Sequence, residues 1–255
     1  MTRAALLVVR PRAQATDWVA RLAAEGVDAH ALPLIGILPA PDPAAVLRAF
    51  GRIAASAARA PVLVFVSANA VEGFFEAAGA PAWPAGALAG ATGPGTVAAL
   101  RAAGVPEAAI AAPPVAAAQF DSEALWAVIG AWPWAGRPAW LVRGNGGREW
   151  LGDQLRAAGA EVQVLQSYAR AAPVLDAAER ALLAAARAAP ARWAWLFSAS
   201  EAIDNLEALA PGADWSGARA LATHPRIAER ARAAGFGEVA LVAATPVAVA
   251  AALHG

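Results

Sequence analysis

The sequence predicts an α/β protein built of two similar lobes, each a parallel sheet covered by helices on both faces. Short continuous runs of valine and leucine alternate with amphipathic runs along the 255 residues, a pattern typical of buried parallel strands joined by helices. The same succession of runs occurs twice, with an offset of slightly more than half the chain. Each copy also contains a proline-containing connection at the same place.

The first part of the repeat is a strand, a helix and a second strand. Arg10 and Gly26 in the first copy correspond to Arg143 and Gly159 in the second, each pair 133 residues apart. The expected elements are 6–10, 18–25 and 27–32 in the first copy, and 139–143, 150–158 and 160–165 in the second.

The second part of the repeat follows the connection and is expected to form strand, helix, strand and helix. Its strands include residues 62–66 and 193–197. Ser67 and Pro94 correspond to Ser198 and Pro225, each pair 131 residues apart. Chance does not readily keep serine, proline and glycine markers in one register, even in an alanine-rich chain.

The connections, residues 33–43 and 166–176, contain Pro33, Pro39, Pro41, Pro43 and Pro173. Proline disfavours helix at the residue before it, so both connections are expected to be extended. They are the natural linkers between the lobes.

Composition restricts the function further. Hydrophobic residues make up 59% of the chain, enough for packed cores. The 20 basic residues balance 20 acidic ones, which argues against a general binder of nucleic acid or of anionic membranes. The chain has no cysteine, and its three histidines show no metal-ligand spacing, so we expect no metal and no cofactor.

No segment resembles a secretion signal or a membrane span. Arg10-Pro11-Arg12 interrupts the apolar N-terminal run, and Thr245-Pro246 interrupts the apolar run near the C-terminus. Both runs are shorter than the ~20 residues that a spanning helix needs. A cytoplasmic protein is therefore expected.

Small and polar residues follow the expected strands, where ligands bind in parallel α/β sheets. Free amides at helix N-termini favour anions by ~0.3–1 kcal/mol for each exposed carboxylate. Each turn alone could merely cap a helix, but the set on both lobes predicts an anion-binding cleft. The turns are residues 67–69, 92–96, 143–148, 198–200 and 223–226, flanked by Arg10, Arg12, Arg143, Arg148 and Arg226.

Four further features admit more than one interpretation. Tyr168, the only tyrosine, could pack in the core or give a hydrogen bond or proton to a leaving group. His224 could be a ligand contact, and residues 119–123 resemble a helix cap. Residues 93–98 fit a GxGxxA dinucleotide pattern, but prolines stand where its acidic partner would follow, which disfavours a nucleotide-linked oxidoreductase.

Taken in order, these motifs resemble the uroporphyrinogen-III synthase family over nearly the whole chain. The resemblance implies flavodoxin-like halves joined by two antiparallel linker strands. It also implies a first lobe of residues 1–35 and 170–255 and a second lobe of residues 36–169. The residues that carry it are 9–11, 65–71, 93–96, 120–123, 143–149, 168–170 and 197–206.

The same resemblance implies a lyase of heme biosynthesis that dehydrates and cyclises hydroxymethylbilane, with inversion of ring D, to uroporphyrinogen III. Tyr168 would assist the loss of the hydroxyl. The expected protein is a monomer that binds neither nucleic acid nor membrane and meets the preceding pathway enzyme at most transiently. The expected substrate-binding residues are Arg10, Ser67, Asn69, Thr92, Gly93, Pro94, Arg143, Gly144, Arg148, Ser198, Ser200, Thr223 and Arg226.

The residues alone leave a second class open. Twin α/β lobes with two linkers and a polar cleft also fit a two-lobed cytoplasmic anion-binding or sensory module without catalysis.

Overall fold

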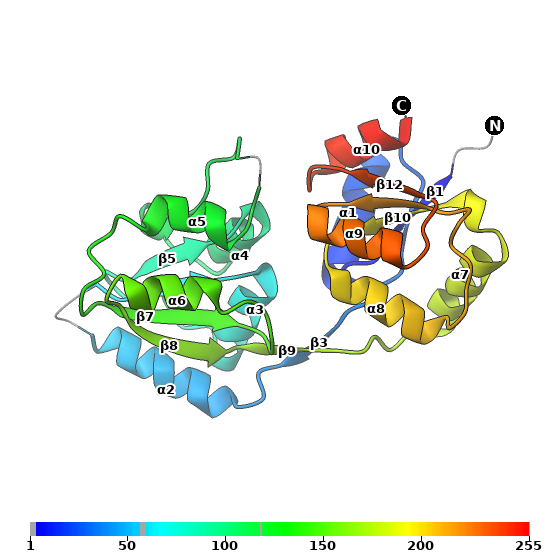
Figure 1. Cartoon of the computed structure of the whole chain (residues 1–255). Helices are drawn as coiled ribbons and strands as arrows, with labels where there is room; N and C mark the ends of the chain where they lie inside the picture. Colours follow the sequence, from blue (N-terminus) through cyan, green and yellow to red (C-terminus); the bar gives the residue numbers. More distant parts are fainter. Residues whose placement is uncertain (1–3, 57–59, 118, 255) are drawn as a thin grey trace. The chain divides into compact units, whose positions relative to one another are not determined.

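Two five-stranded parallel sheets organise the chain (Figure 1). The computed structural model describes residues 4–56, 60–117 and 119–254. It divides into unit 1, Met1–Gly36 with Ala171–Gly255, and unit 2, Ile37–Arg170. The predicted fold class, two parallel-sheet α/β lobes with a small additional sheet, is confirmed.

The sheet of unit 1 has the strand order β12-β11-β10-β1-β2, with every neighbouring pair parallel. Its central strands are continuous apolar runs because helices cover both faces. The strands are β1 (Ala5–Val8), β2 (Ala29–Ala31), β10 (Trp193–Phe197), β11 (Arg219–Ala222) and β12 (Glu238–Leu241).

Alternate residues of β1 enter two different cores, as the strand period of two requires. Leu6 and Val8 pack with helices α1 (Arg12–Ala24) and α10 (Pro246–His254). Leu7 packs on the opposite face, which is covered by α7 (Ala177–Ala188), α8 (Ser200–Leu209) and α9 (Pro225–Ala233).

The sheet of unit 2 has the order β6-β5-β4-β7-β8 and is also parallel throughout. Its strands are β4 (Val62–Phe65), β5 (Leu88–Ala91), β6 (Ile110–Ala111), β7 (Pro138–Arg143) and β8 (Glu161–Gln166).

The helices of unit 2 again form two layers. Val62 and Val64 face α5 (Ser122–Ile129) and α6 (Trp150–Ala157), whereas Leu63 and Phe65 face the other layer. That layer consists of α2 (Pro43–Ala54), α3 (Ala68–Ala77) and α4 (Pro94–Ala102). Short 3₁₀ turns, η1 (Glu107–Ala109) and η2 (Pro190–Arg192), precede β6 and β10.

Strand pairing confirms the internal repeat. In unit 1, β1 lies between β10 and β2, and in unit 2, β7 lies between β4 and β8. The strands that the sequence places 133 and 131 residues apart therefore occupy equivalent positions. Unit 1 has the flavodoxin-like strand order, and unit 2 has the same spatial order with a circularly permuted chain.

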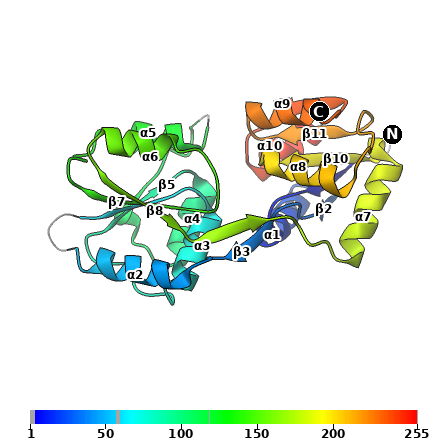
Figure 2. The same ribbon diagram turned by 60° about the horizontal axis from the view of Figure 1, so that its bottom comes forward.

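The two proline-containing connections each contribute a strand to a separate small sheet (Figure 2). β3 (Gly36–Pro39) pairs there with β9 (Tyr168–Ala171), in the antiparallel sense that the resemblance implied. A side chain at Gly36 would lie 2.9 Å from the carbonyl oxygen of Ala172, so the close approach of the two strands requires glycine.

Several elements of the structure differ from those expected. The first helix begins at Arg12, directly after the N-cap Pro11, rather than at Trp18. Each unit has a fifth strand, β6 or β12, that the repeat did not reveal. Helices α2 and α7 were also missed, although Asp42-Pro43 and the Asp176–Glu179 capping box are recognisable helix starts.

Within the described part of the chain, no helix has the length and apolar character needed to cross a membrane.

Candidate functional site

The predicted binding residues follow the carboxyl ends of strands in their own unit. In each parallel sheet these ends share one edge, so each unit presents one group of turns. Unit 2 carries Ser67, Asn69, Thr92, Gly93, Pro94, Arg143, Gly144, Arg148 and Tyr168, and unit 1 carries Arg10, Ser198, Ser200, Thr223 and Arg226.

Tyr168 lies at the start of β9 and joins two of the turns of unit 2. Its side chain is buried, with 3% of the residue exposed. Its hydroxyl accepts a hydrogen bond from Ser67 Oγ at 3.3 Å. Its ring covers Gly144 so closely that a Cβ there would lie 2.7 Å from the ring Cζ. The turns after β4 and β7 therefore both contact this tyrosine.

The chain just before Tyr168 is fixed against α3. Ser167 is fully buried, and its Oγ donates to the carbonyl oxygen of Ala70 at 2.8 Å. Gly73 lets the backbone of Ser167 approach the helix, because a Cβ at Gly73 would overlap the carbonyl oxygen of Ser167. These contacts define where the phenol is placed.

Ser67 is the N-cap of α3, and its Oγ accepts a hydrogen bond from Ala70 N at 3.2 Å. This is the geometry that a serine N-cap normally adopts. Asn69, in the first turn of the same helix, is buried with 6% of the residue exposed. Ser67 thus caps α3 and touches Tyr168 at once.

The turn after β5 has no side-chain helix cap, unlike the turn at Ser67. Thr92 Oγ1 donates to the carbonyl oxygen of Val66 at 3.0 Å, so its hydroxyl ties this turn to the end of β4. Gly93 is the N-cap of α4 without any side-chain cap, and Pro94 is the first helical residue. Phe120 packs on Gly93, and a Cβ at Gly93 would lie 3.0 Å from Phe120 Cβ.

Arg143 is the last residue of β7 and Arg148 lies in the turn that follows, and each forms an ion pair with a glutamate. Arg143 Nη2 donates to Glu149 Oε1 at 2.5 Å; the side chain is only 15% exposed, and Nη1 is buried without a hydrogen-bond partner. Arg148 makes a two-pronged ion pair with Glu123, including Nη2 to Oε2 at 2.6 Å. The hydrogen bonds that Arg148 donates to Glu123 raise the pKa of Arg148.

Asn145 connects the same turn to β9. Its Oδ1 accepts a hydrogen bond from Arg170 N at 2.5 Å, and its Nδ2 donates to Arg170 O at 3.1 Å. The side chain thereby imitates a neighbouring strand. Asn145 was not among the predicted binding residues, although asparagine within a Gly-Asn-Gly-Gly run indicates a turn whose side chain bonds to backbone.

In unit 1, Arg10 is the repeat equivalent of Arg143, and its surroundings differ. Its guanidinium lies 4.5 Å from the centre of the Trp18 ring, and Nη1 donates to Gln14 at 3.4 Å. Nε is buried and has no hydrogen-bond partner. Burial, followed by the charge of Arg21, lowers the pKa of Arg10 to about 10, so the side chain remains cationic at neutral pH.

The turns after β10 and β11 differ in how they cap their helices. The N-cap of α8 is Ala199, which has no side-chain acceptor, so Ser198 does not cap as its equivalent Ser67 does. His224 caps α9, with Nδ1 accepting from Arg226 N at 3.2 Å. Thr223, which precedes this cap, is half-buried.

Side-chain capping, the alternative interpretation of each single turn, occurs in two of the five turns. Only Ser67 and His224 cap by side chain, whereas Gly93, Glu149 and Ala199 leave the helix-start amides without a side-chain acceptor. Asp121, by contrast, caps α5 by accepting from Ala124 N at 2.9 Å, as the pattern of residues 119–123 indicated.

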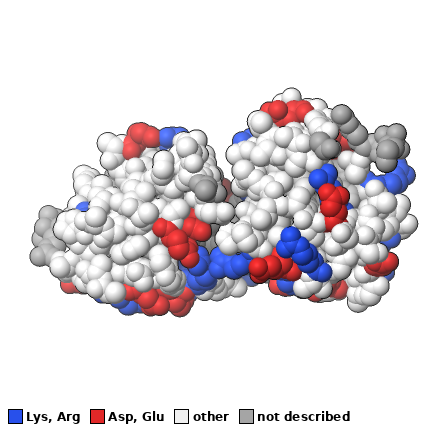
Figure 3. Space-filling view, turned by 45° about the horizontal axis from the view of Figure 1, so that its top comes forward, with Lys and Arg blue, Asp and Glu red and all other residues white. Residues whose placement is uncertain are grey.

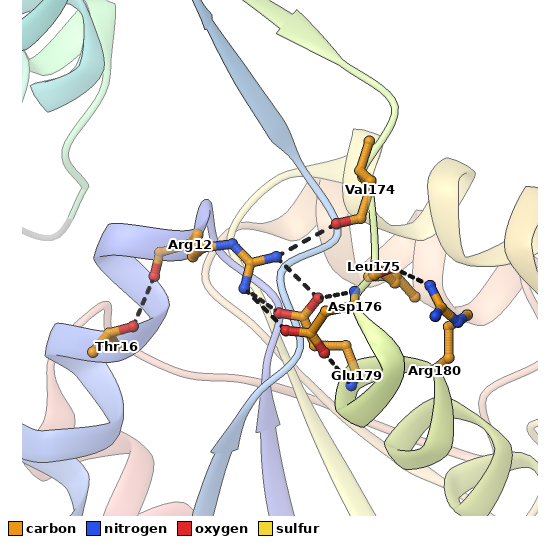
Figure 4. A network of polar contacts seen from close by, with 7 residues as sticks. All are labelled: Arg12, Thr16, Val174, Leu175, Asp176, Glu179 and Arg180. Atoms are coloured by element: carbon orange, nitrogen blue, oxygen red, sulfur yellow. Dashed lines mark hydrogen bonds and ion pairs between the residues drawn. The ribbon is translucent and has the colours of Figure 1, made fainter.

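Arg12, grouped by sequence with the site cations, instead holds two helices of unit 1 together (Figure 4). It donates to both carboxylate oxygens of Glu179, at 2.5 and 2.9 Å. Glu179 also accepts from Asp176 N at 2.8 Å and completes the capping box of α7. Arg12 therefore forms a structural ion pair within unit 1.

Charge is dispersed in small mixed groups. On the face drawn in Figure 3, arginine and acidic side chains lie next to one another within a largely uncharged surface. Among the described residues, no group of three or more His, Asp or Glu is placed to hold a metal ion. Anion binding would thus depend on particular arginines and turns.

Comparisons with known proteins agree with this architecture. The sequence model of the family described as "Uroporphyrinogen-III synthase HemD" matches residues 16–250. The uroporphyrinogen-III synthase of Salmonella typhimurium is 52% identical over 48 residues, which are 19% of this chain. That match spans 20% of the Salmonella protein, about a fifth of its length.

Two solved structures share the fold. A uroporphyrinogen III synthase mutant from the extremely thermophilic bacterium Thermus thermophilus has a TM-score of 0.57 and 18% identity, covering 98% of this chain and 96% of its own. The uroporphyrinogen-III synthetase of Helicobacter pylori has a TM-score of 0.59 and 14% identity, covering 98% and 99%.

Proposed function

Because the chain belongs to the uroporphyrinogen-III synthase family, we propose that it converts hydroxymethylbilane to uroporphyrinogen III. The reaction removes the terminal hydroxyl of the linear tetrapyrrole, inverts ring D and closes the macrocycle. The enzyme is then a lyase of heme biosynthesis. It acts as a cytoplasmic monomer, and its contact with the preceding enzyme of the pathway is at most transient.

The demand on such an enzyme is largely regiochemical. Closure without inversion gives the type I isomer, so the protein must favour one barrier over another. A difference of ~1.4 kcal/mol between two barriers changes the product ratio tenfold. A site that holds the acetate and propionate groups of the substrate in one conformation can supply such a difference by positioning alone.

The observation that carries the proposal is the meeting of Tyr168, Ser67 and Gly144 in unit 2. It places a phenol, a serine hydroxyl and the start of an arginine-containing turn together at a strand-end edge. The helix-start amides of α4 and α8 have no side-chain acceptor, which suits them for carboxylates. Arg10, Arg143, Arg148 and Arg226 provide cations at the same class of turn.

Tyr168 assists hydroxyl loss in one of two ways. Ser67 donates to the phenol oxygen, which leaves the phenol proton for a leaving group. With only 3% of Tyr168 exposed, the alternative is that the tyrosine orients Ser67, and Ser67 contacts the substrate. The pyrrole ring supplies the nucleophile for closure, and no cofactor takes part in this scheme.

The test is to supply hydroxymethylbilane to the purified chain and to separate the type I and type III uroporphyrinogen isomers. The type III isomer should predominate, at a rate above spontaneous closure. Only type I product, formed at the spontaneous rate, would overturn the proposal. Together with retained binding of polycarboxylates, that result would favour an anion-binding or sensory module without catalysis.

A further inference from the structure

The arginines at the strand ends of unit 2 form ion pairs within the protein, whereas those of unit 1 form none within the described part of the chain. In unit 2, Arg143 pairs with Glu149 and Arg148 pairs with Glu123. In unit 1, Arg10 stacks on Trp18, and Arg226 is exposed. Neither Arg10 nor Arg226 forms an ion pair with any residue that the structure describes.

We propose that Glu149 and Glu123 occupy the positions of ligand carboxylates on Arg143 and Arg148, so that a polyanionic ligand must displace them to bind. This inference rests on the proposed function only in naming the ligand class, a molecule with several carboxylates. The arginine-containing turn of unit 2 thus meets two carboxylates of the protein itself that compete with those of the ligand.

The geometry of Arg143 supports displacement rather than a permanent structural pair. One nitrogen of its guanidinium, Nη2, donates to Glu149, while a second, Nη1, is buried without a hydrogen-bond partner. A buried guanidinium nitrogen without an acceptor is unfavourable. A ligand carboxylate that binds both nitrogens in the usual two-pronged geometry would satisfy it.

The glutamates themselves are accessible to replacement. The side chains of Glu149 and Glu123 are 54% and 44% exposed, so solvent can take up either carboxylate once it leaves its arginine. Arg143 is only 15% exposed, so the cation stays in place while its partner exchanges. Both partners of the Arg148–Glu123 pair are solvent-exposed, and exposed ion pairs contribute little to stability, so a ligand can displace Glu123.

Internal competitors make the site selective for polycarboxylates. A side chain tethered near its partner acts at an effective concentration on the order of millimolar. A free monocarboxylate below that concentration does not replace it. A ligand already bound elsewhere through other carboxylates competes as an equally tethered group, so selection follows the number of carboxylates in the ligand.

The chain offers a matched control for this inference. Arg101 pairs with Glu107 at 2.5 Å, the same distance and the same spacing of six residues as Arg143 and Glu149. Arg101 lies in the last turn of α4, away from the strand-end turns. Glu107→Gln therefore changes net charge as Glu149→Gln does, without exposing a strand-end arginine.

The experiment measures binding of benzenehexacarboxylate to the full chain by calorimetry, independently of turnover. Glu149→Gln and Glu123→Gln should each lower the Kd roughly two- to tenfold, and Glu107→Gln should leave it unchanged. Acetate should compete with the probe more effectively in the double variant than in the wild type. Thermal unfolding would verify that all variants are folded.

Three results would overturn the inference. The first is an unchanged Kd in both strand-end variants. The second is no measurable binding of the probe by the wild type and by the double variant. The third is an equal decrease of Kd in Glu107→Gln, which would show that only net charge matters. The displacement and the proposed function can fail separately. Formation of the type III isomer together with an unchanged Kd would overturn the displacement and leave the proposed function standing.

Discussion

At the residue scale, the clearest test concerns the hydroxyl of Tyr168. Tyr168→Phe removes the acceptor of the Ser67 hydrogen bond and any proton that the phenol gives, while the buried ring remains. The variant should fold normally and lose most of its turnover, on the order of 10- to 100-fold in kcat with little change in KM. Steady-state kinetics with isomer separation would measure this.

The matched change is Ser67→Ala, which removes the N-cap of α3 as well as the contact with Tyr168. It should lower stability by about 1 kcal/mol in addition to any kinetic effect. Wild-type turnover in Tyr168→Phe would remove the tyrosine from the mechanism and leave it as a core residue.

A second residue-scale prediction concerns Gly144. A methyl group there would lie 2.7–3.0 Å from three carbons of the Tyr168 ring, and the buried ring has little room to move. Gly144→Ala should therefore destabilise the protein by about 1–3 kcal/mol, as overpacking does. Urea unfolding followed by tryptophan fluorescence would measure it.

Gly95 is the control for this substitution. It lies in the first turn of α4, and a Cβ there would have no neighbour within 4 Å. Gly95→Ala should be neutral or slightly stabilising because alanine favours helix. Equal stability of Gly144→Ala and wild type would mean that the Tyr168 ring is not confined as described.

At the scale of elements, the start of α7 depends on Glu179. Its carboxylate accepts from Arg12 and from Asp176 N, and 7% of the residue is exposed. Glu179→Ala leaves both donors without this acceptor and should lower the free energy of unfolding by about 1–3 kcal/mol. Asp17→Ala, which breaks an exposed pair with Arg21, should change it by less than about 1 kcal/mol.

A double-mutant cycle of Arg12→Ala and Glu179→Ala would isolate the ion pair itself. Because Arg12 is 58% exposed, most of the loss in Glu179→Ala should come from the helix cap rather than from the pair. A coupling energy as large as the whole loss would contradict that division.

The elements show how far the sequence determined the fold. The repeat markers Arg10 and Arg143 led to equivalent strands because apolar runs and polar strand ends are local signals. The 3.3 Å contact of Ser67 with Tyr168 joins residues 101 apart, and no local pattern encodes such a pairing. Arg12 was grouped with the site because sequence shows a charge but not its partner.

At the scale of the whole molecule, the domain boundaries remain a prediction. Unit 2 is one continuous segment, whereas unit 1 needs two. A fragment of residues 36–171 keeps β3, β9 and the entire second sheet, so we expect it to fold alone with a cooperative urea transition. Residues 1–36 alone should remain unfolded because β1 would lack β10.

Circular dichroism and urea titration of the two fragments would measure this. A fragment 36–171 that lacks a cooperative transition would show that the second lobe depends on the first for its stability. In that case residues 36–169 would be a structural unit without being an independent domain.

The discontinuity of unit 1 also has a consequence for biosynthesis. β1 emerges from the ribosome well before its neighbour β10, which is completed only at Phe197. At about 5–20 residues per second, that interval is roughly 10–40 s. During it the nascent chain carries the apolar segment Leu6-Leu7-Val8 without its final partner, while unit 2 is synthesised in full. Aggregation or chaperone binding during translation should therefore begin at this first strand.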